Sequence, residues 1–585
     1  MSPPKAIALI VADPTAGRLG HARRLDAELA GRPVLWHTLH RAARIGGIDR
    51  IVVVHPPGRS PMGRVDPGAF GVPVEALAHD LVVGDAFTPR LRSARRWALS
   101  GWRGGLGGAT AWDELLPAAP LAAAMEKFGG DAAVLVGGDW CGFDPGYATQ
   151  LLELHLGAPE GMKLTFTQAP PGLSPIVTSR AVLADLAQNQ ATFGGLLAYN
   201  PRRPALDPIG REVNLPIPAT VRDTARRFIA DTDAGSLGAL GRAAEVLGNG
   251  FVEADAVAIT DACRAWESEH PDHVFDTLPP QVTVELTPRR IAHGPVTPQH
   301  DVAFDRDDMD AALARDLFAQ LSGRAVTLGG LGDATLHPRW ADLAAAALDA
   351  GVMGLHVETD LLAERAALEP LTDVLGGSRR LIDIVSVNLN ADTAATYEKA
   401  MGVDRFGEVI DTLQWLFDRR GARARNAETG EPSADTSQAA AGVPWVVPRL
   451  VKTLDTLPDM ESFFERWVHL VGHAVIQRPP NGGTGRHALA PDRSPVPMDP
   501  PWKPPSPHQV KHRLTVLSDG TVTLCGQDWL GRAALGNVRD APLLDLWRRA
   551  AELDLPGETD DSPVCRRCRD WWSIHRRSRE AVAAM

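Results

Sequence analysis

The sequence predicts an α/β protein of several domains, and three observations support this prediction. Short apolar runs alternate with helical patterns before about residue 250, strand–helix units of about 30 residues follow from residue 281, and three of the five cysteines lie beyond residue 520. A chain of 585 residues is too long for one hydrophobic core. The predicted units are an N-terminal α/β domain at 1–250, a central (β/α) barrel or partial barrel at 275–478, a proline-rich linker at 479–508 and a cysteine module at 509–585.

The composition is that of an ordinary globular protein, 44% hydrophobic and 23% charged. No apolar run approaches the ~18 residues that a membrane helix needs, and the run at 6–12 ends in Asp13-Pro14, which favours a buried strand over a signal peptide. The net charge of −12 argues against a nucleic-acid partner. Five cysteines in so long a chain form no disulfide framework, so we expect a cytoplasmic protein whose clustered cysteines bind a metal.

The first domain is expected to contain a mainly parallel sheet. Its predicted elements are a strand at 5–12, a helix at 26–46 and strands at 51–54 and 132–136. In such sheets the ligand crevice lies at the carboxyl ends of the strands. This rule places the loop of Thr15 to Gly20 and the residue Asp139 at the same sheet edge.

Segments 6–20, 30–35 and 48–54 resemble the opening of sugar-nucleotide nucleotidyltransferases of the cytidylyltransferase-like group. The resemblance implies a Rossmann-like nucleotide-diphospho-sugar transferase fold, in which Gly17 and Arg18 contact nucleotide phosphates and Asp139 binds Mg²⁺. The glycine run of that family is reduced here, Pro14 removes an amide donor, and Arg23-Arg24 replaces the usual Pro-Lys pair. Two alternatives therefore stay open, an active transferase and a fold retained without transfer chemistry.

The central domain shows repeated strand–helix units, which favour a (β/α) barrel or partial barrel. A 24-residue stretch at 419–442 has no apolar period and is interpreted as an inserted loop, whereas ten prolines within 479–508 predict an extended connector. The predicted strands are 282–287, 325–328, 354–357 and 382–387, and the predicted helices are 309–321, 340–350 and 406–417.

Three segments of this domain are similar to radical S-adenosylmethionine enzymes, namely 285–289, 330–338 and 385–399. The resemblance implies a partial TIM barrel. It also implies that Gly330, Gly332 and Asp333 belong to the loop that meets the amino group of the cofactor in that family, with Asp333 in place of the usual Glu.

The cluster-binding cysteines of that family are absent from this barrel. Its Cys-x-x-x-Cys-x-x-Cys motif is replaced by Arg290, Gly294 and Thr297. Reductive cleavage of S-adenosylmethionine requires a low-potential cluster held by those thiolates, and Arg cannot ligate iron. The sequence therefore argues against radical chemistry and predicts a degenerate barrel that still binds a small ligand.

The C-terminal module carries the most specific pattern in the chain. Residues 514–525 are predicted to form a hairpin with an Asp-Gly turn, followed by a turn at 535–538, a helix at 542–553 and the pair Cys565 and Cys568. This pattern resembles the SPASM domain, an auxiliary-cluster module found behind radical S-adenosylmethionine barrels. Cys525, Cys565 and Cys568 are thus candidate ligands, and buried free thiols are the alternative.

A fourth ligand is missing from the cysteine count. The family has a Pro-Cys pair shortly before the hairpin, where this chain has Pro507-His508. Imidazole replaces thiolate in some clusters, so His508 is the candidate fourth ligand, with His512 and His575 as rivals. The same set also suits Zn²⁺, so a [4Fe–4S] cluster and a structural zinc ion both stay open.

Two functional classes follow from these observations. One is an enzyme of sugar-nucleotide or surface-glycan metabolism with a nucleotide ligand and Mg²⁺ at its N-terminal domain. The other is a non-catalytic binding or scaffold protein made of two degenerate enzyme domains and a metal module. The sequence does not specify a substrate, a protein partner or an oligomeric state.

Overall fold

The computed structural model describes most of the chain and separates it into two compact units, each of which is presented by itself. Unit 1 comprises Met1–Val83 and Ser100–His273, and unit 2 comprises Gly84–Leu99 and Val274–Met585. The described residues are 4–14, 24–81, 117–157, 164–189, 193, 214–222, 224, 226–230, 238–300, 302–373, 375, 382–423, 444–471, 474–477 and 513–552.

Unit 1 is built on a seven-stranded sheet of order β5-β4-β1-β6-β8-β7-β9. Strands β5, β4, β1 and β6 run parallel, while β8 is antiparallel to both β6 and β7. The inner strand β1 is buried along its whole length, as expected for a parallel strand covered on both faces. The bounds are β1 Ala6–Val11, β4 Ile48–His55, β5 Val74–Ala78, β6 Ala132–Gly137, β7 Leu164–Thr167, β8 Ile176–Ser179 and β9 Asn214–Leu215.

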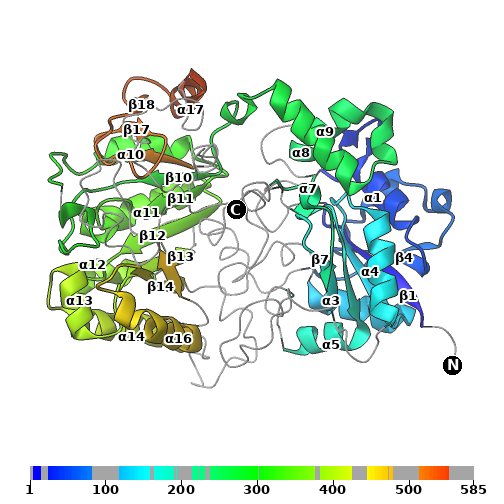
Figure 1. The fold of residues 1–585 in the computed structure, drawn as a ribbon, viewed down its shortest axis with the longest axis horizontal. Helices are drawn as coiled ribbons and strands as arrows, with labels where there is room; N and C mark the ends of the chain where they lie inside the picture. Colours follow the sequence, from blue (N-terminus) through cyan, green and yellow to red (C-terminus); the bar gives the residue numbers. More distant parts are fainter. Residues whose placement is uncertain are drawn as a thin grey trace, which may run out of the picture. The chain divides into compact units, whose positions relative to one another are not determined.

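Helices line this sheet, with α3, α4 and α5 along the strands in Figure 1. A buried arginine of α1, Arg41, joins the helix to two distant segments: its guanidinium donates to the carbonyl oxygens of Phe251 at 2.7 Å, Ala254 at 2.7 Å and Phe143 at 3.1 Å. Burial lowers the pKa of Arg41 to about 10. The main helices are α1 Val34–Ala42, α3 Ala118–Phe128, α4 Pro145–Gly157, α5 Arg180–Gln188, α8 Gly238–Leu247 and α9 Ala256–Glu269.

The prediction of one helix over 26–46 was wrong in its first part. A two-stranded ribbon, β2 Glu28–Leu29 and β3 Arg32–Pro33, precedes α1. Its turn residues Ala30 and Gly31 have positive φ values of 47° and 74°, which a right-handed helix does not allow. Pro33 then fixes the start of α1, because its fixed φ suits the residue before a helix.

Unit 2 is built on a nine-stranded sheet of order β15-β14-β13-β12-β11-β10-β16-β17-β18. The six strands β10 to β15 run parallel in chain order, which is the arrangement of an open (β/α) barrel. Strand β16 also runs parallel to β10, and β17 and β18 continue antiparallel. The bounds are β10 Gln281–Val284, β11 Ala325–Leu328, β12 Gly354–Thr359, β13 Ile384–Asn388, β14 Trp445–Val451, β15 Val475–Gln477, β16 Arg513–Val516, β17 Thr521–Thr523 and β18 Ala534–Asn537.

The helices of unit 2 lie on one side of this sheet (Figure 1). Several predicted bounds need correction, among them the strand expected at 282–287, which ends at Val284, and the strand expected at 382–387, which begins at Ile384. The helix expected at 542–553 is shorter, α17 Leu543–Arg548 with a 3-10 turn after it, and α14 continues to Arg423, into the stretch interpreted as an insertion from Arg419. The other helices are α10 Ala311–Ala319, α11 Trp340–Asp349, α12 Arg365–Leu368, α13 Ala394–Met401 and α16 Met460–Val471.

The two faces of the parallel sheet differ in chemistry, because side chains alternate along each strand. One face carries the apolar residues of the core, such as Val282, Leu328 and Val385. The opposite face carries polar side chains in neighbouring register, since Thr283 pairs with Thr327, Thr327 with His356, Glu358 with Ser386, and Asn388 with Arg449. We call this second face the polar face.

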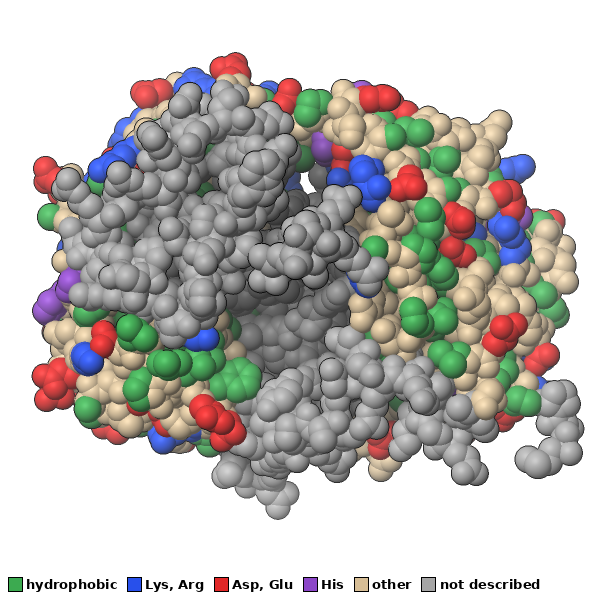
Figure 2. Space-filling view, in the orientation of Figure 1, with side chains coloured by type: hydrophobic (Ala, Val, Ile, Leu, Met, Phe, Trp, Pro, Cys, Tyr) green, Lys and Arg blue, Asp and Glu red, His purple; other side chains and the backbone are tan. Residues whose placement is uncertain are grey.

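The predicted α/β multidomain class is thus confirmed, with two sheets that are largely parallel. On the faces shown in Figure 2, acidic and basic side chains are interspersed over the described surfaces. No helix among the described residues is long and apolar enough to cross a membrane.

Candidate functional site

The predicted nucleotide edge of unit 1 places Asp139 next to the end of β1. Val11 pairs with Gly137, and the Gly138 amide donates to the Val11 carbonyl at 2.7 Å. A Cβ on Gly138 would lie 3.0 Å from the Cβ of Ala12, so glycine allows this close approach. Asp139 is buried, at 1% exposure, at the carboxyl end of β6. Gly17 and Arg18 lie outside the described residues.

The segment after Asp139 has a structural role that the sequence did not reveal. Asp144 accepts hydrogen bonds from the Gly146 amide at 2.7 Å and the Ala256 amide at 2.9 Å. These amides belong to the first turns of α4 and α9, so one carboxylate caps two helices. Asp144 therefore fixes the loop that carries Asp139.

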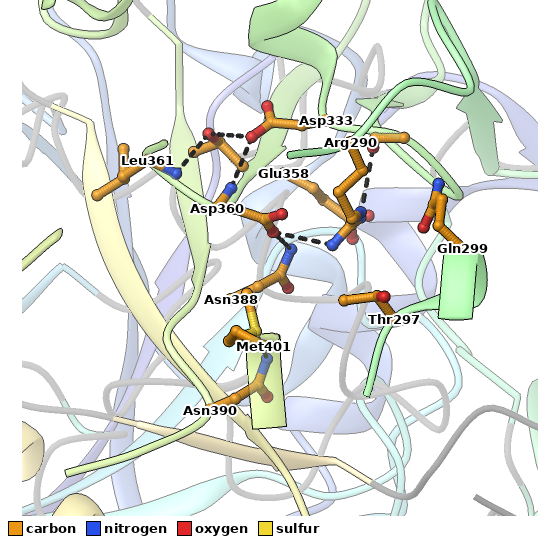
Figure 3. Close-up of polar contacts among 12 residues, drawn as sticks. Arg290, Thr297, Gln299, Asp333, Glu358, Asp360, Leu361, Asn388, Asn390 and Met401 are labelled. Carbon is orange, nitrogen blue, oxygen red and sulfur yellow. Dashed lines mark hydrogen bonds and ion pairs between the residues drawn. The ribbon is translucent and has the colours of Figure 1, made fainter. Parts of the chain in front are cut away.

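A buried ion pair occupies the barrel where the resemblance places the first cluster cysteine. The Arg290 guanidinium donates to Asp360 Oδ1 at 2.8 Å and to the carbonyl oxygens of Leu331 and Gly332 at 3.1 and 3.4 Å. The side chains of Arg290 and Asp360 are only 6% and 1% exposed. Figure 3 shows Asp360 between Arg290 and Asn388, whose amide also donates to Asp360 Oδ1 at 2.8 Å.

The network continues across the polar face to β14. Arg449 donates to Glu358 Oε1 at 2.9 Å and to the amide oxygen of Asn388, and the Gly330 amide donates to Glu358 Oε2 at 3.1 Å. Burial raises the pKa of Asp360 to about 6, and the charge of Asp333 adds to the rise, whereas Arg290 opposes it.

At the other two positions where the resemblance places cluster cysteines, 294 and 297, neighbouring atoms leave no space or the side chain is already hydrogen-bonded. A Cβ on Gly294 would lie 2.3 Å from the Ala400 carbonyl oxygen and 2.4 Å from the Gly402 amide nitrogen, both backbone atoms. Thr297 is buried, and its hydroxyl donates to the Gly294 carbonyl at 2.8 Å. This loop is shaped around glycine and has no space for a side chain at position 294.

The loop with Gly330, Gly332 and Asp333 is held by internal bonds. Asp333 Oδ1 accepts from the amide and hydroxyl of Thr335 at 3.0 and 2.6 Å, and Oδ2 accepts from the Thr359 hydroxyl at 3.0 Å and the Asp360 amide at 2.8 Å. Both oxygens are therefore engaged by the protein itself. A Cβ on Gly332 would lie 1.9 Å from the Thr287 carbonyl, so the loop requires glycine there.

The hairpin predicted at 514–525 is confirmed by the antiparallel pair β16 and β17, with Gly520 at a φ of 90° in its turn. Cys525 is half-buried just after β17. The Gln527 amide donates a hydrogen bond to the Cys525 sulfur at 3.2 Å. Amide bonds to sulfur stabilise a thiolate, which suits a metal ligand.

Two contacts join this hairpin to the barrel. Buried Glu285, just after β10, accepts from Arg306 at 3.0 Å and from the Ser518 amide at 3.3 Å. Burial raises the pKa of Glu285, against the opposing charge of Arg306. Trp529 packs with Leu331 of the glycine loop in a small apolar cluster. The hairpin that precedes Cys525 and the glycine loop of the barrel are therefore held together by these contacts.

Three candidate ligands, His508, Cys565 and Cys568, lie outside the described residues, as do the rivals His512 and His575. Within the part of the chain that the structure describes, no three His, Cys, Asp or Glu side chains are grouped as a metal site. The residues that sequence reasoning missed are Glu358, Asp360, Asn388 and Arg449. The alternation His-x-Glu-x-Asp over 356–360 in an otherwise apolar strand was the available signal.

Residues 508–569 match the family model of the SPASM domain, described as an iron–sulfur cluster-binding domain. The match confirms the resemblance of the C-terminal module and indicates iron–sulfur binding by this segment. It begins at His508 and includes Cys525, Cys565 and Cys568.

Relatives of other parts of the chain are distant. An uncharacterized protein of Treponema pallidum (strain Nichols) is 23% identical over 316 residues, which are 52% of this chain and 82% of the relative. Crystallised BtrN, in complex with AdoMet and 2-DOIA, is 14% identical with a TM-score of 0.31 over 50% of this chain and 94% of its own.

Two further solved structures are similar to parts of the chain. A cytidylyltransferase from Leptospira borgpetersenii serovar Hardjo-bovis is 12% identical, with a TM-score of 0.30 over 46% of this chain and 96% of its own. Streptococcus suis SuiB, bound to precursor peptide SuiA, is 11% identical, with a TM-score of 0.34 over 50% of this chain and 69% of its own.

Proposed function

We propose that this chain is a cytoplasmic iron–sulfur protein whose SPASM-type module binds a [4Fe–4S] cluster through Cys525, Cys565, Cys568 and His508, behind a barrel that does not cleave S-adenosylmethionine. The observation that carries the proposal is the buried pair of Arg290 and Asp360. The Arg290 guanidinium stands where the resemblance expects the first cluster cysteine, and it donates hydrogen bonds to three acceptors.

Two further features of the barrel support the loss of radical chemistry. Position 294 has no space for a cysteine side chain, because backbone atoms of 400–402 lie against it. Asp333 is engaged by four protein donors, so its carboxylate is not offered to the amino group of a cofactor. The SPASM match over 508–569 supports iron–sulfur binding by the C-terminal module.

The metal assignment is tested on anaerobically purified protein. An iron–sulfur cluster absorbs near ~400 nm and brings iron and sulfide in equal amounts. We expect this spectrum in the wild type and its loss in Cys568→Ala, with Cys263→Ala as a buried-thiol control from unit 1. Stoichiometric zinc without visible absorbance would exclude the cluster and support a structural zinc module.

The barrel assignment is tested separately with S-adenosylmethionine and a strong reductant. We expect no 5′-deoxyadenosine, because no ligand set for a low-potential cluster is present at 290, 294 and 297. Product formation over several turnovers, retained after Cys568→Ala, would show that the barrel holds an active cluster of its own.

A second candidate function, nucleotide binding linked to sugar-nucleotide or surface-glycan metabolism, is favoured by the position of Asp139 beside the end of β1. In this proposal Asp139 would hold Mg²⁺, which would supply positive charge for nucleotide phosphates, and Arg18 would offset their remaining charge. CTP, UTP or GTP with Mg²⁺ should then raise the melting temperature of the wild type, and Asp139→Asn should abolish the shift. Exposed Asp131→Asn is the control, and a shift that persists in Asp139→Asn contradicts the site.

A further inference from the structure

Helix α1 of unit 1 contains a buried threonine that the proposed chemistry does not use. Thr38 is fully buried, as are its apolar neighbours Leu35 and Leu39 in the same helix. A buried hydroxyl costs free energy unless it is hydrogen-bonded, whereas valine has nearly the same shape and needs no partner. The hydrogen bond that Thr38 makes is therefore what distinguishes it from an apolar residue at this position.

The Thr38 hydroxyl donates out of its own helix. It lies 2.8 Å from the Gly138 carbonyl oxygen and 3.3 Å from the Val34 carbonyl oxygen of α1. A hydroxyl has one proton to donate, and the shorter distance assigns this proton to Gly138. Thr260 of α9 shows the ordinary alternative, since its buried hydroxyl donates at 2.7 Å to the Ala256 carbonyl of the same helix.

The bond to Gly138 fixes one of the two peptide groups that flank Asp139. The Gly138 carbonyl belongs to the peptide group before Asp139. The Asp139 carbonyl belongs to the peptide group after it and accepts from the Ala230 amide at 2.9 Å, while the Gly138 amide donates to Val11 at 2.7 Å. Two fixed peptide groups determine the backbone angles of the residue between them, and these angles set the direction of its Cα–Cβ bond.

Of these three bonds, only the one from Thr38 comes from a side chain. It restrains a glycine, which has the widest choice of backbone angles. Loss of the hydroxyl would therefore allow the peptide group between Gly138 and Asp139 to rotate. Arg41, three residues further along α1, holds the other end of the loop by donating to the Phe143 carbonyl at 3.1 Å. Two polar side chains of one helix thus hold both ends of the loop 138–143.

We propose that Thr38 is a positioning residue that directs the Asp139 carboxylate toward a divalent cation, an inference that rests on the nucleotide function proposed for unit 1. Carboxylate oxygens suit both Mg²⁺ and Mn²⁺, so Asp139 fits such an ion. Mg²⁺ demands nearly ideal octahedral geometry, so the direction of each ligand matters. Thr38 acts on this ligand through the backbone of Gly138.

Mn²⁺ binding to the full-length protein, in the presence of CTP, UTP or GTP, tests the proposal. Electron paramagnetic resonance follows the signal of free Mn²⁺, which falls as the ion binds. We expect Thr38→Val to weaken Mn²⁺ binding about tenfold, because loss of a residue that orients a metal ligand typically lowers metal affinity by about 10–100-fold. Thr38→Ser keeps the hydroxyl and should restore most of the affinity.

The matched control is Thr260→Val, which also removes a buried hydroxyl bond from a helix of unit 1. The two valine variants should lose similar stability, but only Thr38→Val should lose Mn²⁺ affinity. If Thr38→Val does not fold, Thr38→Ala also lacks the hydroxyl and takes its place under the same outcomes.

The outcomes separate this inference from the nucleotide proposal. Wild-type affinity in Thr38→Val, or equal weakening in both valine variants, overturns the positioning role alone when Asp139→Asn still abolishes binding. Absence of Mn²⁺ binding by the wild type, or unchanged binding in Asp139→Asn, overturns the nucleotide proposal, and the role of Thr38 falls with it.

Discussion

The buried arginines Arg41 of unit 1 and Arg290 and Arg449 of unit 2 are satisfied differently. Arg41 of unit 1 donates to three backbone carbonyls and has no carboxylate partner among its described hydrogen bonds. Arg290 and Arg449 of unit 2 each bond to a buried carboxylate. Carbonyl partners hold a guanidinium without adding a second charge. The bonds of Arg41 therefore only connect the chain segments that carry those carbonyls. Carboxylate partners create a charge balance that a ligand or a proton can change.

The largest effect is expected from Arg290→Met. The substitution leaves Asp360 buried without its cation, and breaking a buried pair costs about 3–5 kcal/mol. The free energy of unfolding of unit 2, followed by hydrogen exchange of its strands, should fall by this amount. The double variant Arg290→Met with Asp360→Asn should recover part of the loss. A double variant no better than the single one would show that the two charges are not coupled.

Arg41→Met should cost somewhat less, about 3 kcal/mol in unit 1, because three buried carbonyls lose their donor but no charge is left behind. Arg44→Met is the matched control, since Arg44 is 39% exposed and pairs with Glu253, which is 60% exposed, so its loss should cost under about 1 kcal/mol. Chemical denaturation of the two variants measures the difference. Equal losses of unfolding free energy in the two variants would show that the carbonyl-bound Arg41 stabilises unit 1 no more than the exposed Arg44 does.

Gly294→Ala should destabilise unit 2 by about 2 kcal/mol, because the added methyl group meets the backbone at 400–402. Gly407→Ala is the control, since position 407 is exposed in α14 and open to a Cβ, so alanine should stabilise the helix by about 0.5–1 kcal/mol. The melting temperatures of the two variants should move in opposite directions. A neutral Gly294→Ala would mean that the loop yields and that a cysteine could fit there.

A pH dependence of stability is also expected from Asp360. Its pKa is raised from 3.8 to about 6 in the folded protein, so between these values the folded protein keeps a proton that the unfolded chain has released. The wild type should therefore lose stability as the pH rises from about 4 to about 6, relative to Asp360→Asn. Melting curves of both proteins across this range measure the difference. A difference in melting temperature between the two proteins that does not change with pH would show that the pKa of Asp360 is not raised.

The sequence predicted the elements that local patterns control. The strand at 325–328 and the start of the helix at 340 agree with the structure to the residue, because apolar runs and helical periodicity are local. The helix at 26–46 was too long, since the apolar period continues through a ribbon whose turn depends on backbone angles.

The network around Asp360 was not predictable in the same way. Arg290 and Asp360 are 70 residues apart in the chain, and Arg449 and Glu358 are 91 apart. Only the register of the sheet brings these residues together, and no local pattern carries that information. The absence of cysteines at 290, 294 and 297 was visible in the sequence, but the partners of Arg290 were visible only in the structure.

The parallel pairing of β10 with β16 also bears on how the protein is made. Gln281 of β10 and Arg513 of β16 bond to each other across 232 residues of chain. During synthesis β10 pairs with β11 early, yet its other edge stays open until β16 has left the ribosome, many seconds later at the usual rates of translation. An unpaired apolar strand edge invites wrong partners in that interval.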